Sequence, residues 1–101
     1  MNINPFDLLK NAGKIQEEMG KMQAKLQNLR VRGSAGGGMV EIELNGKLEC
    51  MAVRIDPQVV DSSDIPMLQD LIKAALNNAQ EKARDSIQNE LGPMAGGMGL
   101  A

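Results

Sequence analysis

The chain of 101 residues has no histidine, tryptophan or tyrosine, and it has only one phenylalanine and one cysteine. Without histidine, a catalytic triad built on imidazole is impossible, and a cysteine-histidine zinc site cannot form within one chain. A lone cysteine makes no disulfide framework, and the pattern leads us to expect neither a secretory leader nor a membrane-spanning run. The composition therefore predicts a soluble cytoplasmic protein that is not an enzyme and uses no cofactor, metal or small-molecule substrate.

The net charge of −2 conceals an asymmetry along the chain. Residues 1–33 carry six basic and three acidic side chains, a net charge of +3, whereas residues 34–101 carry five basic and ten acidic ones, a net charge of −5. An acidic protein as a whole attracts nucleic acid poorly, but local charge decides which surface attracts an anion. The split indicates a basic element on an acidic body.

The first residues have the pattern of one long helix, predicted from Pro5 to Leu29. Asn4 can cap its N-terminus, Pro5 suits the first helical position, and Asp7 places negative charge in the first turn. Apolar residues recur in alternating steps of four and three: Leu8, Ala12, Ile15, Met19, Met22, Leu26 and Leu29. This spacing is typical of the a/d seam of a coiled coil, and it predicts a surface for core packing or dimerisation.

Four lysines of the same helix share one flank. At about 100° per residue they fall within a sector of roughly 60°, about 120° from the centre of the seam; they are Lys10, Lys14, Lys21 and Lys25. One interpretation is a basic stripe that meets an anionic partner. The alternative is a solvated face with charges paired inside the helix, because Glu17 is spaced to pair with Lys21. Glu18 is likewise spaced to pair with Lys14 and Lys21.

A glycine-rich run, Gly33 to Gly38, follows the helix. It does not match a phosphate-binding loop, because a Walker loop needs a lysine and a hydroxyl residue after its last glycine, and a dinucleotide loop needs a strand before it. Alternating apolar and acidic residues over 39–44 instead predict a half-buried strand directly after the run. Gly37 and Gly38 are expected to need positive φ.

Asn45-Gly46 is a strong hairpin signal, and it predicts a tight turn into a second strand over residues 48–55. The apolar residues of this strand change phase by one residue near Cys50. That change predicts either a bulge there or a strand covered on both faces. Cys50 is expected to be buried as a small hydrophobic residue.

A second helix is predicted to begin near Ser63 or Asp64, with Pro66 in its first turn, and to stop at Gly92. Its apolar residues share one face, on which small alanines permit a close approach to a neighbour: Leu68, Leu71, Ile72, Ala75, Ala79, Ala83 and Ile87. Residues 1–92 are thus expected to form a single domain, and residues 93–101 a flexible tail rich in glycine and methionine.

The chain resembles the YbaB/EbfC family of bacterial nucleoid-associated DNA-binding proteins in four segments that occur in order: the long helix, GSAGGGMVEIELNG, CMAVRIDPQVV and MLQDLIKAALNNAQEKA. The likeness covers nearly the whole chain. It implies an α+β fold with a long N-terminal helix, a three-stranded antiparallel sheet and a C-terminal helix. It also implies that residues 31–36 form the first strand, and that a tweezers-like homodimer binds and bends DNA in the nucleoid.

The length of the first helix supports a partner chain. A helix of about 25 residues is roughly 37 Å long, whereas strands of about six or seven residues span roughly 20 to 23 Å. The helix must therefore overhang the sheet, and its seam would be exposed to water in a monomer. We expect a homodimer in which the second chain shares in covering this seam.

With the family as a guide, double-stranded DNA is the expected partner. Its phosphates are expected to contact eight basic residues: Lys10, Lys14, Lys21, Lys25, Arg30, Arg32, Lys82 and Arg84. Since Phe6 is the one aromatic residue, no stacking platform exists, and single strands should bind less well than duplex. The alternative from another class is a dimeric helical scaffold or adaptor that binds a protein partner through the seam.

Overall fold

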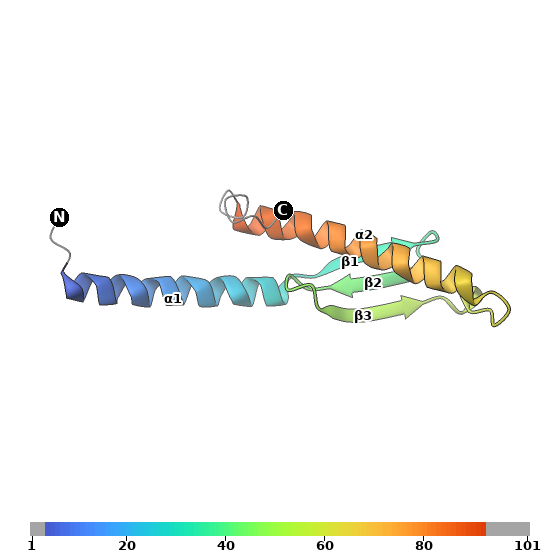
Figure 1. Ribbon diagram of the computed structural model, residues 1–101, viewed down its shortest axis with the longest axis horizontal. Coiled ribbons are helices and arrows are strands. Elements are labelled where there is room, and N and C mark those ends of the chain that lie inside the picture. Colours follow the sequence, from blue (N-terminus) through green and yellow to red (C-terminus); the bar gives the residue numbers. More distant parts are fainter. Residues whose placement is uncertain (1–3, 93–101) are drawn as a thin grey trace.

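Two long helices and one small sheet make up the chain (Figure 1). The structure is a computed structural model, and it describes residues 4–92. Its elements, in order, are α1 (Pro5–Asn28), β1 (Val31–Ala35), β2 (Val40–Leu44), β3 (Cys50–Ile55), the 3-10 turn η1 (Pro57–Val59) and α2 (Ile65–Leu91). The α+β class and the antiparallel three-stranded sheet are confirmed. The expected tail, residues 93–101, lies outside the described residues.

Helix α1 begins where the capping signals predict. The Asn4 side chain accepts a hydrogen bond from the Phe6 amide at 3.0 Å, and Pro5 occupies the first helical position. The helix ends at Asn28, one residue earlier than predicted, because Leu29 is extended, with φ −66° and ψ 138°. Leu29 thus turns the chain directly toward β1.

The glycine run is a turn that joins β1 to β2. Gly36, Gly37 and Gly38 have φ values of 63°, 68° and 92°, in a region that residues with a Cβ atom rarely enter. The expectation for Gly37 and Gly38 is confirmed. The first strand implied by the family resemblance is also confirmed, and it ends at Ala35.

Strand β3 pairs with β2 at one edge of the sheet, whose order is β1-β2-β3. The register shifts between Glu43, which faces Ala52, and Leu44, which faces Cys50, so that Met51 is the extra residue of a bulge. The bulge is the correct one of the two predicted alternatives. The prediction that Cys50 is buried is wrong, because α2 packs on β1 and β2 and leaves the edge strand exposed (Figure 1).

The loop between β2 and β3 is wider than the tight turn predicted for it. The Asn45 amide donates to the Glu49 carbonyl oxygen at 3.1 Å, and Asn45 Oδ1 accepts from the amides of Lys47 at 2.9 Å and Glu49 at 3.0 Å. The positive φ, 64°, falls at Leu48 and not at Gly46. The predicted hairpin is confirmed, because β2 and β3 pair antiparallel on either side of this loop, and only the tightness of the turn is wrong. The Asn45 side chain organises the whole loop, and Gly46 contacts the backbone of Leu26 in α1.

Helix α2 has the predicted ends. The Asp64 side chain caps its first turn by accepting from the Met67 amide at 3.3 Å, and Pro66 lies in that turn. At the other end the Gly92 amide donates to the Gln88 carbonyl oxygen at 2.8 Å, with Gly92 at φ 61°. Glycine is well suited to this left-handed position.

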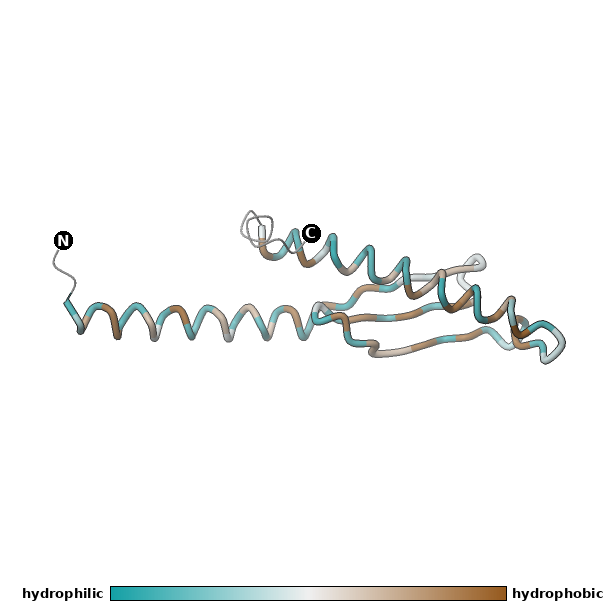
Figure 2. Tube along the Cα trace, viewed as in Figure 1, coloured by the Kyte–Doolittle hydropathy of each residue, from teal (hydrophilic) through white to brown (hydrophobic). Residues whose placement is uncertain are grey.

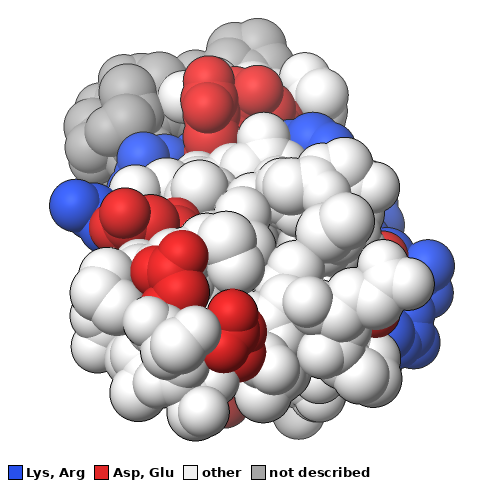
Figure 3. Space-filling model, turned by 90° about the vertical axis from the view of Figure 1, so that its right-hand side faces the viewer, with Lys and Arg blue, Asp and Glu red and all other residues white. Residues whose placement is uncertain are grey.

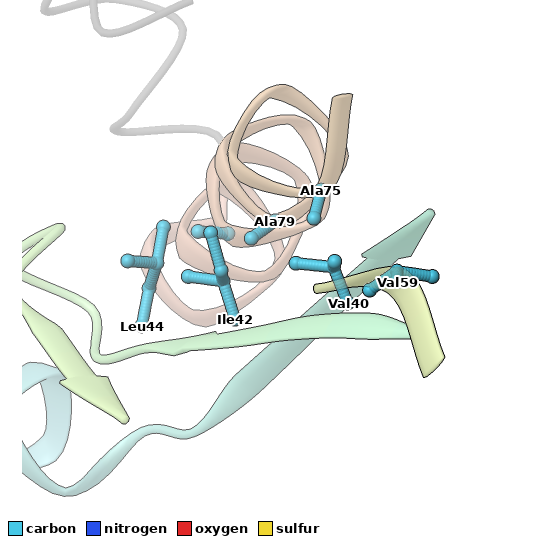
Figure 4. Packing of buried hydrophobic residues seen from close by; sticks show 7 residues of the cluster. Val40, Ile42, Leu44, Val59, Ala75 and Ala79 are labelled. Carbon is cyan, nitrogen blue, oxygen red and sulfur yellow. The ribbon is translucent and has the colours of Figure 1, made fainter. Parts of the chain in front are cut away.

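The core lies between α2 and the central strand (Figure 4). Alternate residues of β2 point toward the alanines of α2, and the buried apolar residues are Val40, Ile42, Leu44, Val59, Ala75, Ala79 and Ala83. The alanines let the helix approach β1 very closely. A Cβ atom on Gly33 would lie 2.5 Å from the Ala75 carbonyl oxygen and closer still to the Ala79 amide nitrogen.

Helix α1 projects from this core as an arm, the name used below for residues Pro5–Asn28. None of the arm's residues is buried, and the molecule is 72 Å long but only 21 by 17 Å across. Figure 2 shows hydrophobic residues recurring along the arm, and Figure 1 shows that most of its length lies beyond the sheet. The expected overhang is confirmed.

The close contact at Gly33 generates a stability prediction. Gly33→Ala should lower the free energy of unfolding by about 3 kcal/mol, because the added methyl group meets backbone atoms of α2 that have no room to move aside. Urea denaturation measures the loss. The matched control is Gly13→Ala in the arm, where nothing lies within 4 Å of an added Cβ, and it should stabilise the chain by about 0.5 to 1 kcal/mol. Equal stability of the two variants would contradict the packing of α2 on β1.

Candidate nucleic-acid interface

The lysine stripe, which comprises Lys10, Lys14, Lys21 and Lys25, lies entirely on the exposed arm. Steps of four, seven and four residues keep these side chains on one flank over about 22 Å of helix. The stripe therefore presents four lysines in a row along the arm.

Ion pairs engage one half of the stripe. Lys21 Nζ lies 3.7 Å from Glu17 and 3.8 Å from Glu18 within the arm, whereas Lys25 Nζ lies 3.3 Å from Glu90 on α2. These pairs are exposed, and such pairs are worth about 0 to 1 kcal/mol each.

The other half of the stripe has free charges. Within residues 4–92 no carboxylate lies within 4.0 Å of Lys10 or Lys14, so the pair expected between Glu18 and Lys14 does not form. The distal end of the arm is thus its most available basic surface.

The two arginines that follow the arm are already engaged. Arg30 Nη1 donates to the carbonyl oxygens of Gln27 at 2.7 Å and Leu29 at 3.0 Å, so it caps the C-terminus of the arm. Arg32 Nε lies 3.2 Å from Glu43 Oε1. Neither guanidinium therefore adds an unpaired positive charge to the surface that the lysine stripe forms.

The open face of the sheet is a neutral ladder of ion pairs. Glu41 accepts from Arg54 Nη1 at 3.3 Å and lies 3.6 Å from Arg32 Nε, so each strand contributes to the ladder. The partners face one another across the sheet because the register pairs Glu41 with Arg54 and Glu43 with Arg32. Arg54 was not selected from the sequence. Antiparallel pairing of its strand with β2 places it opposite Glu41, so the alternation of the two strands could have identified it.

The two basic residues of α2 occupy different surroundings. Arg84 lies near the C-terminal end of the arm, called its root below, which comprises Leu26 and the residues up to Asn28. There it lines a hollow of about 310 Å³, whose other lining residues are Leu26, Gly46, Lys47, Leu48, Ile87 and Leu91. Lys82 is exposed elsewhere on α2. The structure therefore brings Arg84 near the arm, and it also places there Lys47, which the sequence analysis did not select.

The end of the molecule opposite the arm is acidic. Its loop, residues 56–64, contains three aspartates, and Figure 3 shows Asp and Glu side chains on this end, with Lys and Arg at its margins. Hydrogen bonds from the Ser63 hydroxyl at 2.7 Å and the Ser63 amide at 2.9 Å lower the pKa of Asp61 below its ordinary value of 3.8. This carboxylate thus keeps its charge in mildly acidic solution and helps to repel anions from this end.

Apolar surface is exposed along the arm and along β3. Ile15 and Met19 in the seam are 59% and 58% exposed, and Val53 in β3 is 51% exposed. The seam residues nearer the body, Met22, Leu26 and Leu29, are half-buried, and Ala12 is exposed. A row of large apolar side chains in water is unusual for a monomer, so this row is a candidate interaction surface.

Neither helix in the described part of the chain has the length and hydrophobicity that a membrane crossing needs. Within residues 4–92 no three side chains of histidine, cysteine, aspartate or glutamate are grouped so that they could hold a metal ion. The candidate site is therefore the arm with its two surfaces, one basic and one apolar.

The structure is thus a small α+β protein from which one long helix with a stripe of lysines projects. The model of the YbaB/EbfC DNA-binding family matches residues 1–98, and the chain belongs to this family. A nucleoid-associated protein of Dictyoglomus thermophilum is 42% identical over 97 residues, which are 96% of this chain and 93% of that protein. A nucleoid-associated protein of Mycolicibacterium vanbaalenii is 46% identical over 92 residues, which are 91% of this chain and 84% of that protein.

A solved structure supports the fold. The crystal structure of the uncharacterized protein HP0035 from Helicobacter pylori matches with a TM-score of 0.72 and 22% identity, over 87% of this chain and 92% of that chain. The family resemblance read from the sequence is thus confirmed by the family match and by the relatives.

The electrostatics of the acidic end can be tested at one residue. Ser63→Ala removes the hydroxyl that donates to Asp61, so the pKa of Asp61 should rise toward 3.8. The pKa of Asp61 is lower in the folded state than in the unfolded state. Its contribution to stability is therefore fully present above the pKa of the unfolded state, and it is lost as the pH falls through the pKa of the folded state. Titration of the Asp61 carboxyl carbon by NMR measures the shift. An identical titration curve in both proteins would contradict the role of Ser63.

Proposed function

We propose that the protein binds double-stranded DNA as a homodimer, through contacts between the lysine stripe and backbone phosphates, and that it changes the conformation of DNA in the nucleoid. The observation that carries the proposal is the projecting arm, on which all four lysines of the stripe are exposed and two, Lys10 and Lys14, make no ion pair within residues 4–92. Membership of a DNA-binding family and the nucleoid-associated relatives support it.

The dimensions of the stripe suit a nucleic-acid backbone. Lys10 and Lys25 are separated by about 22 Å along the helix axis, and phosphates of one DNA strand follow one another about every 3.4 Å along the duplex. One arm can therefore run beside about six phosphates. Ammonium groups on flexible stems contact phosphates without reading bases, so affinity should depend little on sequence and strongly on salt.

Duplex DNA fits the surface better than a single strand. Proteins that hold single strands stack bases on aromatic side chains, and this chain has one aromatic residue, Phe6. Phe6 lies in the first turn of the arm, where it is 78% exposed. One ring does not make a platform for successive bases.

Dimerisation is the part of the proposal that the apolar surfaces support. The heptad spacing of the seam is the pattern that pairs helices, and Ile15 and Met19 have no cover within the described chain. A symmetric pair covers each patch with its own copy. Two arms held by one dimer would bring two stripes to one duplex, and contact at both gives the protein a means of bending it.

The dimer proposal predicts that a charge in the exposed seam is costly. Ile15→Asp should shift the protein from dimer to monomer at micromolar concentration, because burying an unpaired carboxylate between packed helices costs several kcal/mol. In a chain that is monomeric by nature, the same exposed position should tolerate the change within about 0.5 kcal/mol. Light scattering coupled to size exclusion measures the mass.

The control for this experiment is Ala24→Asp, an exposed position on the side of the arm opposite the seam. It introduces the same charge and should leave the dimer intact. A wild-type mass of 10.9 kDa at micromolar concentration would refute the dimer and the two-armed mechanism together.

The phosphate contacts predict a change in salt dependence. The double variant Lys10→Gln with Lys14→Gln removes the unpaired half of the stripe and keeps helix propensity. It should bind duplex DNA more weakly at moderate salt, with the slope of log K against log salt falling by about 0.9 for each lost contact. The dimer would lose four cations. Fluorescence anisotropy with a labelled duplex at several salt concentrations measures both quantities.

Lys73→Gln is the matched control, because it removes an exposed lysine from α2 instead of the arm. It should change the slope little. If the double variant and the parent have the same affinity and slope, the stripe is only a solvated face. A seam that still forms a dimer would then favour the scaffold or adaptor that binds a protein partner.

A further inference from the structure

The arm is attached to the body only at its root. Along the arm every residue is exposed except Met22 and Leu26, which are half-buried. Leu29 and Arg30 alone separate the arm from β1. Because the helix is held at one end, a small displacement at the root produces a larger displacement of the lysine stripe.

Gly46 meets the arm at this root. Its amide donates a hydrogen bond of 2.7 Å to the carbonyl oxygen of Leu26, which also accepts a longer one, of 3.3 Å, from the Leu29 amide at the end of the helix. A Cβ atom on Gly46 would lie 2.6 Å from that oxygen and 2.8 Å from the Leu26 Cα atom. Both neighbours are backbone, so the arm itself would have to move.

The conformation of Gly46 shows why the residue is glycine. Its φ is not positive, because the positive φ of this loop falls at Leu48. Glycine is therefore not needed here for a left-handed turn. It is needed because only a residue without a side chain lets the backbone of the arm approach so closely.

The loop that carries Gly46 is held in one conformation by the hydrogen bonds of Asn45. Asn45 is 1% exposed, and its Nδ2 donates to Glu49 Oε1 at 2.9 Å while its Oδ1 binds two loop amides. Buried polar groups that are fully hydrogen-bonded hold one geometry. Gly46 is thus fixed relative to the sheet.

The remaining contacts at the root restrain the position of the arm less. Lys25 and Glu90 form an exposed ion pair at 3.3 Å, and the hollow of about 310 Å³ lies between Leu26 and the residues of α2 that line it. The arm therefore rests on the Gly46 loop and has open space on the α2 side. The direction of the arm is set mainly by the contact between Gly46 and Leu26.

We propose that Gly46 is a positioning residue that fixes the angle between the arm and the body, and thereby the conformation that the bound DNA takes. The second half of this statement rests on the proposed function, whereas the first half concerns the protein alone. Ordinary contact begins at 3.4 Å, so an added Cβ is 0.8 Å too close (3.4 minus 2.6). A root displacement of about 1 Å over one turn of about 5.4 Å tilts a helix by about 10°, which moves a residue about 22 Å further along it by about 4 Å.

The test compares Gly46→Ala with Gly13→Ala, which makes the same chemical change within the arm where nothing lies near. Spin labels on Asn11→Cys and Asn89→Cys, in a Cys50→Ser background and diluted with unlabelled protein, report the distance from the arm to the end of α2 that lies beside it within one chain. Gly46→Ala should shift this distance by up to about 4 Å, and Gly13→Ala should not. An unchanged distance in a folded Gly46→Ala protein would overturn the proposal.

DNA measurements separate the two proposals. With dye-labelled duplex ends, Gly46→Ala should change the bend while the salt slope stays that of the parent, because no cation is removed. A shifted arm with an unchanged bend would overturn the link to DNA conformation. If the parent binds no DNA, the proposed function and the link both fail, and the distance measurement still decides the role of Gly46.

A measurement on the unmodified protein covers the case in which Gly46→Ala does not fold. The Gly46 amide should exchange with solvent much more slowly than that of Gly37 in the exposed turn between β1 and β2, because it is held by Leu26. Equally fast exchange at both amides would show that the arm does not rest on Gly46, and it would overturn the proposal without any variant.

Discussion

The close packing of α2 on β1 and β2 is the constraint from which the rest of the structure follows. Small residues make it possible, with Gly33 on the strand and Ala75 and Ala79 on the helix. The alternating residues of β2 fill the space between them (Figure 4). One helix covers two of three strands in this way and cannot also cover β3 or the arm. The chain thus completes one small core and leaves two apolar surfaces without cover.

Those uncovered surfaces and the charge asymmetry meet on the arm. One side of the helix carries the seam, and a flank about 120° away carries the lysine stripe. A partner chain on the seam would leave the stripe free, so dimerisation and DNA binding do not compete for the same side chains. The acidic loop at the opposite end of the molecule (Figure 3) would orient the protein, because a phosphate backbone is attracted to one end and repelled from the other.

Much of this arrangement could be predicted from the sequence, because local signals and tertiary packing agree. Asn4 starts the arm, Asp64 starts α2 and Gly92 ends it, each through a hydrogen bond to a near neighbour in the chain, and Pro5 has the fixed φ that suits a first helical position. The phase change near Cys50 marked the bulge. The first strand depended on family resemblance, since a strand of Val31, Gly33 and Ala35 has no clear apolar alternation.

The errors concern contacts between distant segments, which a local pattern does not contain. Asn45-Gly46 resembles a tight turn, yet Gly46 is glycine because of Leu26, 20 residues earlier. Cys50 lies in an apolar strand, yet it is exposed because α2 packs on the other two strands. The engagement of Arg32 with Glu43 and of Lys25 with Glu90 also depends on register and on where the helices meet. On the arm, Lys10 and Lys14 are the lysines that make no ion pair within residues 4–92, and the eight phosphate contacts stay a prediction.

If the protein binds DNA as proposed, the arm is the surface that meets it. The most direct test is an NMR titration of the ¹⁵N-labelled protein with a short duplex at low salt, which reports every backbone amide separately. Chemical-shift changes are expected to concentrate in residues 10–25 and to be small in the acidic loop, residues 56–64. Shifts that cluster on β3 or on that loop while the arm stays unchanged would contradict this expectation.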